Sequence, residues 1–245
     1  MELNGKASIV TGGGSGIGRA TALALAREGV RVIVADRDEP GADETARQIR
    51  SAGGEARTAP GDVIWPPYFE ELIETCERTY GGLDILFNNA GVATGLPPFP
   101  DGDLSRWELT LDVNLYAVIL GTQLAIHAMR RRGGGAIINT SSTAAISGVE
   151  IDPVYAASKG GVLLFTRSLA GLKERDGIRV NCICPGVVET PFVLSAEDPE
   201  LRALAERLPT LQPEQIAEAV LDLLRDDEAA GKALVVSASR PRGYL

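Results

Sequence analysis

We predict an α/β fold for this chain of 245 residues, with one doubly wound sheet of seven parallel strands and helices on both of its faces. Three observations lead to this prediction. Short β-rich runs alternate with helical patterns, a glycine-rich turn joins the first run to the first helical pattern, and no linker rich in Pro or Ser divides the chain. Such alternation is typical of right-handed βαβ units. A chain of this length can bury one large core, so residues 1–245 are expected to form a single domain.

The seven predicted strands are short apolar runs between helical patterns: residues 6–11, 31–35, 55–60, 84–88, 135–141, 178–183 and 232–237. Residues 93–103 carry too many Pro and Gly to form an element. We expect residues 192–211 to form a substrate lid that contains a helix, with an apolar inner face at residues 192–194. Residues 237–245 are expected to be a C-terminal tail.

The charge balance narrows the classes of partner. The formal net charge is −9 and the pI is about 4.8, which argues against nucleic acid or an anionic membrane as a general partner. The basic run at residues 130–132 is interpreted as a solvated helix end, with a docking point as the alternative. No basic leader precedes an apolar run at the N-terminus, and no apolar stretch approaches the roughly 20 residues of a membrane helix. We therefore expect a cytoplasmic protein.

The cysteines and the single histidine predict no metal site. Cys182 and Cys184 lie two apart on a predicted strand, without the further Cys or His that a zinc site needs. Together with Cys76 they are interpreted as buried thiols in a reducing compartment. His127 is expected to pack or to face solvent, so neither a Ser-His-Asp hydrolase site nor a histidine metal cluster is predicted.

A glycine-rich turn follows the first predicted strand and precedes an alanine-rich helical pattern. Gly12 permits a tight turn, Gly16 lets the backbone approach a pyrophosphate, and Gly18 lets helix and strand pack closely. Ser15 and Ile17 lie in the same turn, at the helix N-terminus whose free N–H groups attract phosphate. The turn predicts dinucleotide binding, and a merely structural turn is the alternative.

Asp36 predicts which dinucleotide binds. It directly follows the second predicted strand, 18 residues after Gly18, where a carboxylate can hold a ribose 2′-hydroxyl and repel a 2′-phosphate. This favours NAD over NADP. Arg37 could instead hold a 2′-phosphate, and Asp36 could be no more than a helix cap or a loop residue.

Six motifs, taken together, resemble those of the short-chain dehydrogenase/reductase family. They are TGGGSGIG at residues 11–18, NNAG at 88–91, Asn114, SS at 141–142, YAASK at 155–159 and PGVVETP at 185–191. They appear in the family's order, and the resemblance extends from Lys6 to about Val236. It implies a Rossmann fold and an oxidoreductase that uses a nicotinamide dinucleotide.

The resemblance also implies roles for individual residues. Asp62 and Val63 match the pair that borders the adenine. The adenosine side of the cofactor would be supported by Asn89, Ala90 and Gly91. The nicotinamide would be supported by Pro185, Gly186, Val188 and Thr190. Thr190 would bond the carboxamide. Asn114 matches a residue that joins a proton relay through water, with a buried packing amide as the alternative.

Ser142, Tyr155 and Lys159 match the family's catalytic residues. A free tyrosine has a pKa near 10, which is too high for an effective base near neutrality, and a nearby ammonium lowers it. Tyr155 would then be the general base in oxidation and the general acid in reduction, Lys159 would tune it and hold the nicotinamide ribose, and Ser142 would bind the substrate oxygen. Ser141 is the alternative to Ser142, and a surface contact is the alternative for the Tyr155–Lys159 pair.

The predicted function is hydride transfer between NAD(H) and a secondary alcohol or its ketone. The alternative is a dinucleotide-binding regulator or sensor with little turnover. Long apolar helical patterns at residues 104–130 and 154–174 offer more surface than one sheet buries, so we expect a homotetramer, with a dimer as the alternative.

Overall fold

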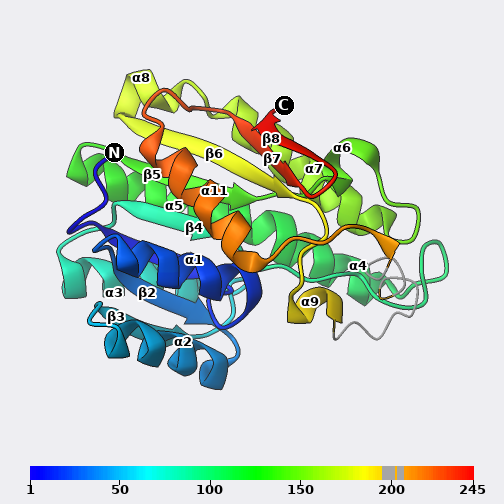
Figure 1. The fold of residues 1–245 in the computed structure, drawn as a ribbon, viewed down its shortest axis with the longest axis horizontal. Helices are drawn as coiled ribbons and strands as arrows, with labels where there is room; N and C mark the ends of the chain where they lie inside the picture. Colours follow the sequence, from blue (N-terminus) through cyan, green and yellow to red (C-terminus); the bar gives the residue numbers. More distant parts are fainter. Residues whose placement is uncertain (195–201, 203–206) are drawn as a thin grey trace.

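One eight-stranded sheet forms the middle layer of the molecule, and helices cover both of its faces (Figure 1). The structure is a computed structural model that describes residues 1–194, 202 and 207–245. The strand order is β3-β2-β1-β4-β5-β6-β7-β8. The strands are β1 (Ala7–Thr11), β2 (Arg31–Asp36), β3 (Ala56–Pro60), β4 (Ile85–Asn88), β5 (Gly135–Thr140), β6 (Ile178–Pro185), β7 (Ala233–Ser237) and β8 (Arg240–Tyr244).

All seven predicted strands are present and pair in parallel. β1, β4 and β5 are buried over their whole length, because helices cover both of their faces. Their sequences are accordingly almost continuously apolar, and this is why they could be recognised.

The prediction of seven strands is wrong by one, because β8 pairs antiparallel with β7. All five residues of β8 are exposed, so the strand has no alternation of apolar and polar positions to mark it. It also contains Pro241 and Gly243, which are uncommon inside strands. Most of the predicted C-terminal tail therefore belongs to the sheet.

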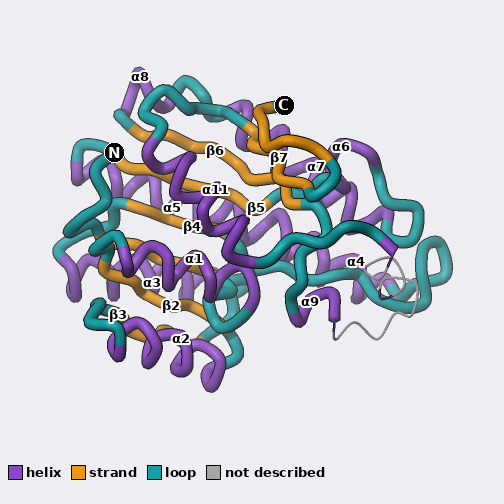
Figure 2. The backbone as a smooth tube through the Cα atoms, in the orientation of Figure 1, coloured by secondary structure: helices purple, strands orange, loops and turns teal. Residues whose placement is uncertain are grey.

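The helices form the two outer layers (Figure 2). On one face lie α1 (Gly16–Arg27), α2 (Glu39–Ser51) and α11 (Pro213–Arg225), whose buried side chains share one core cluster. On the other face lie α3 (Pro66–Tyr80), α5 (Ala117–Arg132) and α7 (Pro153–Ser168). The short elements are α4 (Leu104–Leu111), the π-helical turn η1 (Asp112–Tyr116), α6 (Ala144–Ser147), α8 (Leu172–Asp176) and α9 (Pro191–Leu194).

The strand order reverses at β1, which pairs with β2 on one side and with β4 on the other. In an open α/β sheet, the connections that leave the carboxyl ends of two such strands run in opposite directions and leave a crevice between them. The turns that follow β1 and β4 carry the predicted glycine-rich turn and the NNAG motif, so the topology brings these two motifs together.

One helical run, Leu104–Arg132, is long and apolar enough to cross a membrane by length and composition, with a mean hydropathy of 1.5 over its most apolar window. The expectation that no apolar stretch approaches this length is therefore wrong. In the fold, 44% of that window is buried, and α5 packs on β4 and β5. The run thus contributes apolar residues to the core of this domain.

The cysteines, the histidine and the basic end of α5 were also subjects of prediction. The three cysteines are free and buried. His127 is exposed on α5, and the three arginines that end α5 pair with Asp176, Glu77 and Asp84. No cluster that could hold a metal occurs among the described residues. The predicted lid helix lies largely outside the described residues, which include Phe192, Val193 and Leu194 in α9.

Candidate active site

A cavity of about 280 Å³ opens at the carboxyl edge of the sheet, beside β1 and β4. Nearly all the predicted site residues line it. The lining includes Gly12, Ser15, Gly16, Ile17, Asp36, Arg37, Asp62, Val63, Asn89, Ala90, Gly91, Ser142, Tyr155, Lys159, Pro185, Gly186, Val188 and Thr190. Of the predicted set, only Gly18 and Asn114 are not in direct contact with the cavity.

The glycine-rich turn is built by very close approach of its own backbone. A Cβ added to Gly18 would lie 2.0 Å from the Gly12 carbonyl oxygen, so no larger residue fits there without moving the turn. The Asn89 side chain braces the turn by donating to the Thr11 carbonyl at 3.0 Å. Ser15 stands at the N-cap of α1 but its hydroxyl does not cap the helix. The first-turn N–H groups of α1 therefore have no side-chain cap and can receive a phosphate.

Asp36 is held rigidly at the end of β2. One carboxylate oxygen accepts from the Gly14 N–H at 2.8 Å and the other accepts from the Asp38 N–H at 2.9 Å. Asp38, not Asp36, is the N-cap of α2. The half-buried carboxylate therefore faces the cavity in a fixed orientation, and the exposed Arg37 side chain follows it.

Helix α7 carries the predicted catalytic pair at its N-terminal end. Asp152 caps the helix by accepting from the Tyr155 N–H at 3.0 Å, and Pro153 occupies the first turn, as predicted. Lys159 follows one turn after Tyr155, and its Nζ lies 5.8 Å from the centroid of the tyrosine ring. The same Nζ donates to the Thr140 carbonyl at 2.9 Å.

The two serines after β5 point in different directions. The Ser141 hydroxyl is buried and donates to the Lys159 carbonyl at 2.9 Å, which ties β5 to α7. Both serines line the cavity, but among the described residues the Ser142 hydroxyl makes no bond to a carbonyl and accepts only from the Ala144 N–H, at 3.1 Å. This geometry favours Ser142 over Ser141 as the serine that faces a substrate.

Burial dominates the electrostatics of the pair. It raises the pKa of Tyr155 to about 12, although the nearby Ser142 hydroxyl acts in the opposite direction. Burial also lowers the pKa of Lys159 to about 8. Both shifts disfavour the charged form, as expected for groups removed from water.

Asn114 lies in η1 and its side-chain amide is fully occupied within the protein. Its Oδ1 accepts from the Val92 N–H, and its Nδ2 donates to the Val92 carbonyl, each at 2.8 Å, and also to Ser158 at 3.2 Å. These contacts match the packing-amide alternative for the side chain. π-Helical turns are nevertheless frequent at functional sites, because they reorient the backbone.

Four lining residues were not predicted: Gly61, Val92, Val113 and Thr140. Thr140 ends β5 and Val92 lies four residues after β4, so their place at the carboxyl edge could have been inferred. Phe192 closes the substrate end, with its ring 5.9 Å from the Tyr155 ring and tilted by 43°. The cavity thus has an open helix N-terminus and a carboxylate at one end and a serine, tyrosine and lysine at the other. This arrangement fits a nicotinamide dinucleotide.

Comparison with known proteins identifies the family. The family model for short chain dehydrogenases matches residues 6–200. The chain belongs to the short-chain dehydrogenase family. It is therefore an oxidoreductase that acts on CH–OH groups with NAD(P).

Three relatives illustrate the range of proteins that this chain resembles. Cyclohexanol dehydrogenase of Acinetobacter sp. is 35% identical over 92% of this chain and 90% of its own length. 3β-Hydroxysteroid dehydrogenase 1 of Eggerthella lenta is 39% identical over 92% of this chain and 88% of its own. 15-Hydroxyprostaglandin dehydrogenase [NAD(+)] of Mus musculus is 34% identical over 98% and 93%, respectively. Among solved structures, levodione reductase aligns with a TM-score of 0.89 and 28% identity, covering 96% of this chain and 97% of its own.

Proposed function

We propose that this short-chain dehydrogenase transfers hydride between NAD(H) and a secondary alcohol or its ketone, with Tyr155 as the general acid and base. One observation carries the proposal. Ser142, Tyr155 and Lys159 meet at one end of a cavity whose other end holds the glycine-rich turn and Asp36. A protein that only sensed the dinucleotide would need the glycine-rich turn and Asp36, but it would not need Ser142, Tyr155 and Lys159.

The bound nicotinamide would supply hydride chemistry, and the protein's groups would manage the proton. In oxidation, the Tyr155 phenol oxygen takes the hydroxyl proton of the alcohol, while Ser142 holds the same oxygen in place. Even with Lys159 beside it, burial raises the pKa of Tyr155 to about 12, so the lowering that the sequence led us to expect from Lys159 is not present and almost no phenolate forms near neutrality. The positive charge of a bound nicotinamide ring would have to supply that lowering.

Asp36 supports NAD as the dinucleotide. Its carboxylate is fixed by two backbone N–H groups and faces the cavity, where a 2′-phosphate would meet a negative charge that cannot turn away. Arg37 is exposed and also lines the cavity, so it remains the group that could hold a 2′-phosphate, but in the described part of the chain no ion pair joins it to Asp36. The proposal is therefore NAD in preference to NADP.

The substrate end supports an uncharged, cyclic or partly apolar alcohol. Val92, Phe192 and Val193 line this end of the cavity, and Phe192 packs against Tyr155. Relatives include dehydrogenases named for cyclohexanol, cyclopentanol and a 3β-hydroxysteroid, each of which carries its hydroxyl on a carbon ring. We propose the same class for this chain.

The test is a screen by NADH absorbance over cyclic secondary alcohols and their ketones, with NAD and NADP supplied in parallel. We expect turnover with NAD, and loss of most turnover in Tyr155→Phe while NADH binding is retained. Equal turnover in the wild type and Tyr155→Phe would refute the acid/base assignment. Tight NADH binding without turnover across the panel would favour the sensor.

We further propose that the protein is cytoplasmic and assembles as a homotetramer, with a dimer as the alternative. Three buried free thiols support a reducing compartment. Exposed leucines and isoleucines on α4, α5 and α7 support association through that layer: Leu104, Ile119 and Leu164.

A further inference from the structure

We propose that Asp152 is a positioning residue that joins the catalytic helix to the loop after β4 and so fixes the substrate wall relative to Tyr155. This inference rests on the proposed function, in which Tyr155 moves the proton. It concerns a residue that does not line the cavity.

The two oxygens of Asp152 have separate tasks. Oδ1 accepts from the Tyr155 N–H at 3.0 Å, which caps α7. Oδ2 accepts from the Thr94 N–H at 2.9 Å, on a loop that lies 58 residues earlier in the chain. A helix cap needs a single acceptor, and Ser, Thr or Asn provide it as well as Asp does. The second bond is thus more than a cap requires.

The segment from Val92 to Thr94 is held at both of its ends. Asn114 binds both backbone groups of Val92, each at 2.8 Å, and Asp152 binds the N–H of Thr94. Thr94 is 6% exposed, and its hydroxyl accepts from Thr110 at 3.2 Å. Val92 lines the cavity, so these bonds fix a wall of the site.

The side chains of Asn114 and Asp152 are also connected by hydrogen bonds to the backbone of Tyr155. The Tyr155 carbonyl accepts from Ser158 at 2.7 Å, and Ser158 in turn accepts from Asn114 at 3.2 Å. The Tyr155 N–H is bound by Asp152. Side chains therefore hold both backbone groups of Tyr155, and both connections run to the Val92–Thr94 segment. The catalytic residue and the substrate wall form one closed hydrogen-bonded ring.

Loss of the hydrogen bond from the Thr94 N–H to Asp152 would leave α7 capped, but it would let the Val92–Thr94 segment move relative to Tyr155. Displacement of about 1 Å between substrate and catalytic group can reduce rates by about 100-fold. We therefore expect the effect in the alcohol step and an unchanged affinity for the dinucleotide, because Asp152 and Thr94 touch none of the residues assigned to the cofactor other than the Tyr155 backbone.

The charge of Asp152 gives a second readout. Among the described residues, Asp152, the N-cap of α7, is the one charged group that shifts the pKa of Tyr155, and Lys159 of α7 has its Nζ 5.8 Å from the ring, while the neighbours Ser142 and Phe192 from other elements are uncharged. Burial is the main cause of the raised pKa of Tyr155, and the Asp152 carboxylate adds to it by disfavouring the phenolate. Removing that carboxylate lowers the pKa, so the rising limb of the oxidation pH profile moves to lower pH.

Two variants test the proposal. Asp152→Ser keeps a capping oxygen but is too short to reach Thr94, and Asp152→Asn keeps the shape and one acceptor. We expect both to lower kcat/KM for the alcohol by about 10- to 100-fold, to move the rising limb to lower pH, and to leave the Kd of NADH unchanged. Asp103→Ser, at the N-cap of α4 where the aspartate makes no capping bond, is the matched control and should behave as wild type.

The outcomes separate this inference from the proposed function. Wild-type kcat/KM and an unmoved pH profile in both variants would reduce Asp152 to a helix cap. Loss of NADH affinity by the same factor as kcat/KM would indicate general collapse of the site and would also overturn the inference. If Asp152→Ser does not fold, Asp152→Asn decides alone. Activity that persists in Tyr155→Phe contradicts the proposed function instead.

Discussion

At the scale of single residues, Lys159 shows a conflict between activity and stability. Its side chain is only 3% exposed, and its Nζ donates to the Thr140 carbonyl with no ion pair recorded among the described residues. Burial lowers the pKa of Lys159 from 10.5 to about 8. Below about pH 8 the lysine is charged in both the folded and the unfolded chain, so the folded protein bears the whole cost of burying the charge. That cost is about 3 kcal/mol from the pKa difference.

We predict that Lys159→Met is inactive but more stable than the wild type at pH 7. The gain should be about 2 kcal/mol, since the lost hydrogen bond to Thr140 offsets about 1 kcal/mol of the relieved charge burial. As pH rises from 8 towards 10, the folded wild type releases its proton before the unfolded chain does, so wild-type stability rises and the difference narrows. Urea unfolding at pH 7 and pH 9.5 measures this. Lys232→Met, at an exposed position, is the control. A less stable Lys159→Met at pH 7 would contradict the argument.

Asp36 and Gly14 should together decide cofactor choice. A Cβ on Gly14 would lie 2.8 Å from Asp36 Oδ2, so a side chain there must displace the carboxylate. We predict that Gly14→Ala and Asp36→Ala both weaken the preference for NAD over NADP, by about 10-fold or more, because each removes or moves the charge that excludes a 2′-phosphate. Paired kcat/KM values with NAD and NADP measure the preference. An unchanged ratio in Asp36→Ala would remove Asp36 from cofactor selection.

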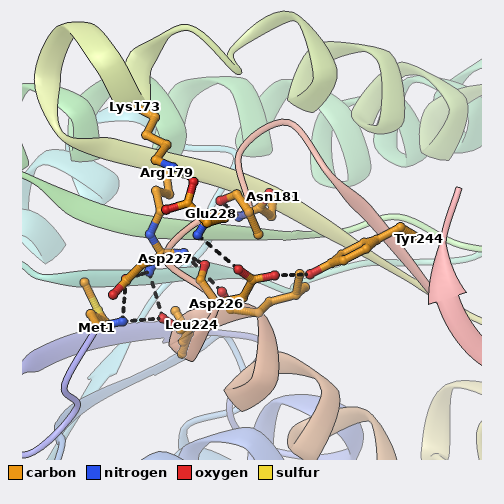
Figure 3. Close-up of polar contacts among 11 residues, drawn as sticks. Met1, Lys173, Arg179, Asn181, Leu224, Asp226, Asp227, Glu228 and Tyr244 are labelled. Carbon is orange, nitrogen blue, oxygen red and sulfur yellow. Dashed lines mark hydrogen bonds and ion pairs between the residues drawn. The ribbon is translucent and has the colours of Figure 1, made fainter.

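At the scale of elements, α11 depends on a buried arginine that comes from the sheet. Arg179 of β6 is 5% exposed and donates to three carbonyls at the C-terminal end of α11: Leu223, Leu224 and Asp226, at 3.1, 2.7 and 3.0 Å (Figure 3). These groups have no partner within a helix, and a cation complements the negative end of the helix dipole. α11 packs against α1, which begins at the glycine-rich turn. The arginine therefore stabilises the layer that supports the dinucleotide end of the site.

We predict that Arg179→Met lowers the free energy of unfolding by about 3 kcal/mol, because it removes three charge-assisted hydrogen bonds and leaves the Leu223 carbonyl without its donor. Met1 and Ala229 still donate to the Leu224 and Asp226 carbonyls. Arg179→Lys should lose less, since a lysine keeps the charge but has no planar fork to reach all three carbonyls. Neither should change kcat/KM where both are folded. Chemical denaturation measures the loss, with Arg240→Met on the exposed strand β8 as control. A loss below about 1 kcal/mol in Arg179→Met would contradict the capping role.

Some elements could be read from the sequence and others could not, for physical reasons. The parallel strands are buried on both faces, so their apolar runs identify them, and the Asp152–Pro153 start of α7 follows from local capping rules. β8 is exposed at every residue and carries no such pattern. The π-helical turn at Asp112–Tyr116 follows from no known local rule. The bond from Asp152 to Thr94 joins residues 58 positions apart, and only the folded chain brings them together.

At the scale of the whole molecule, the helical layer that contains α4, α5 and α7 exposes several large apolar side chains to solvent. Leu104 of α4 and Leu164 of α7 are 66% and 63% exposed, and Ile119 of α5 is 38% exposed. These helices lie on the face opposite to α1, α2 and α11. Large apolar side chains that gather on one layer are typical of a surface that a partner covers. A second copy of the chain is the partner that the expected homotetramer or dimer requires.

We predict that Leu164→Lys breaks this association. Light scattering after gel filtration should give the wild type the mass of four chains of 25.8 kDa, or of two chains if the protein is a dimer. The mass of Leu164→Lys should be smaller than that of the wild type. An interface of standard size buries about 1,600 Å², and a lysine at its apolar centre would leave a charge unpaired and removed from water. Trp65→Lys replaces an apolar side chain that is 59% exposed outside these helices, and it should keep the wild-type mass. A wild type that is monomeric at micromolar concentration would refute the assembly, and an equal loss of mass in both variants would refute its location on α4, α5 and α7.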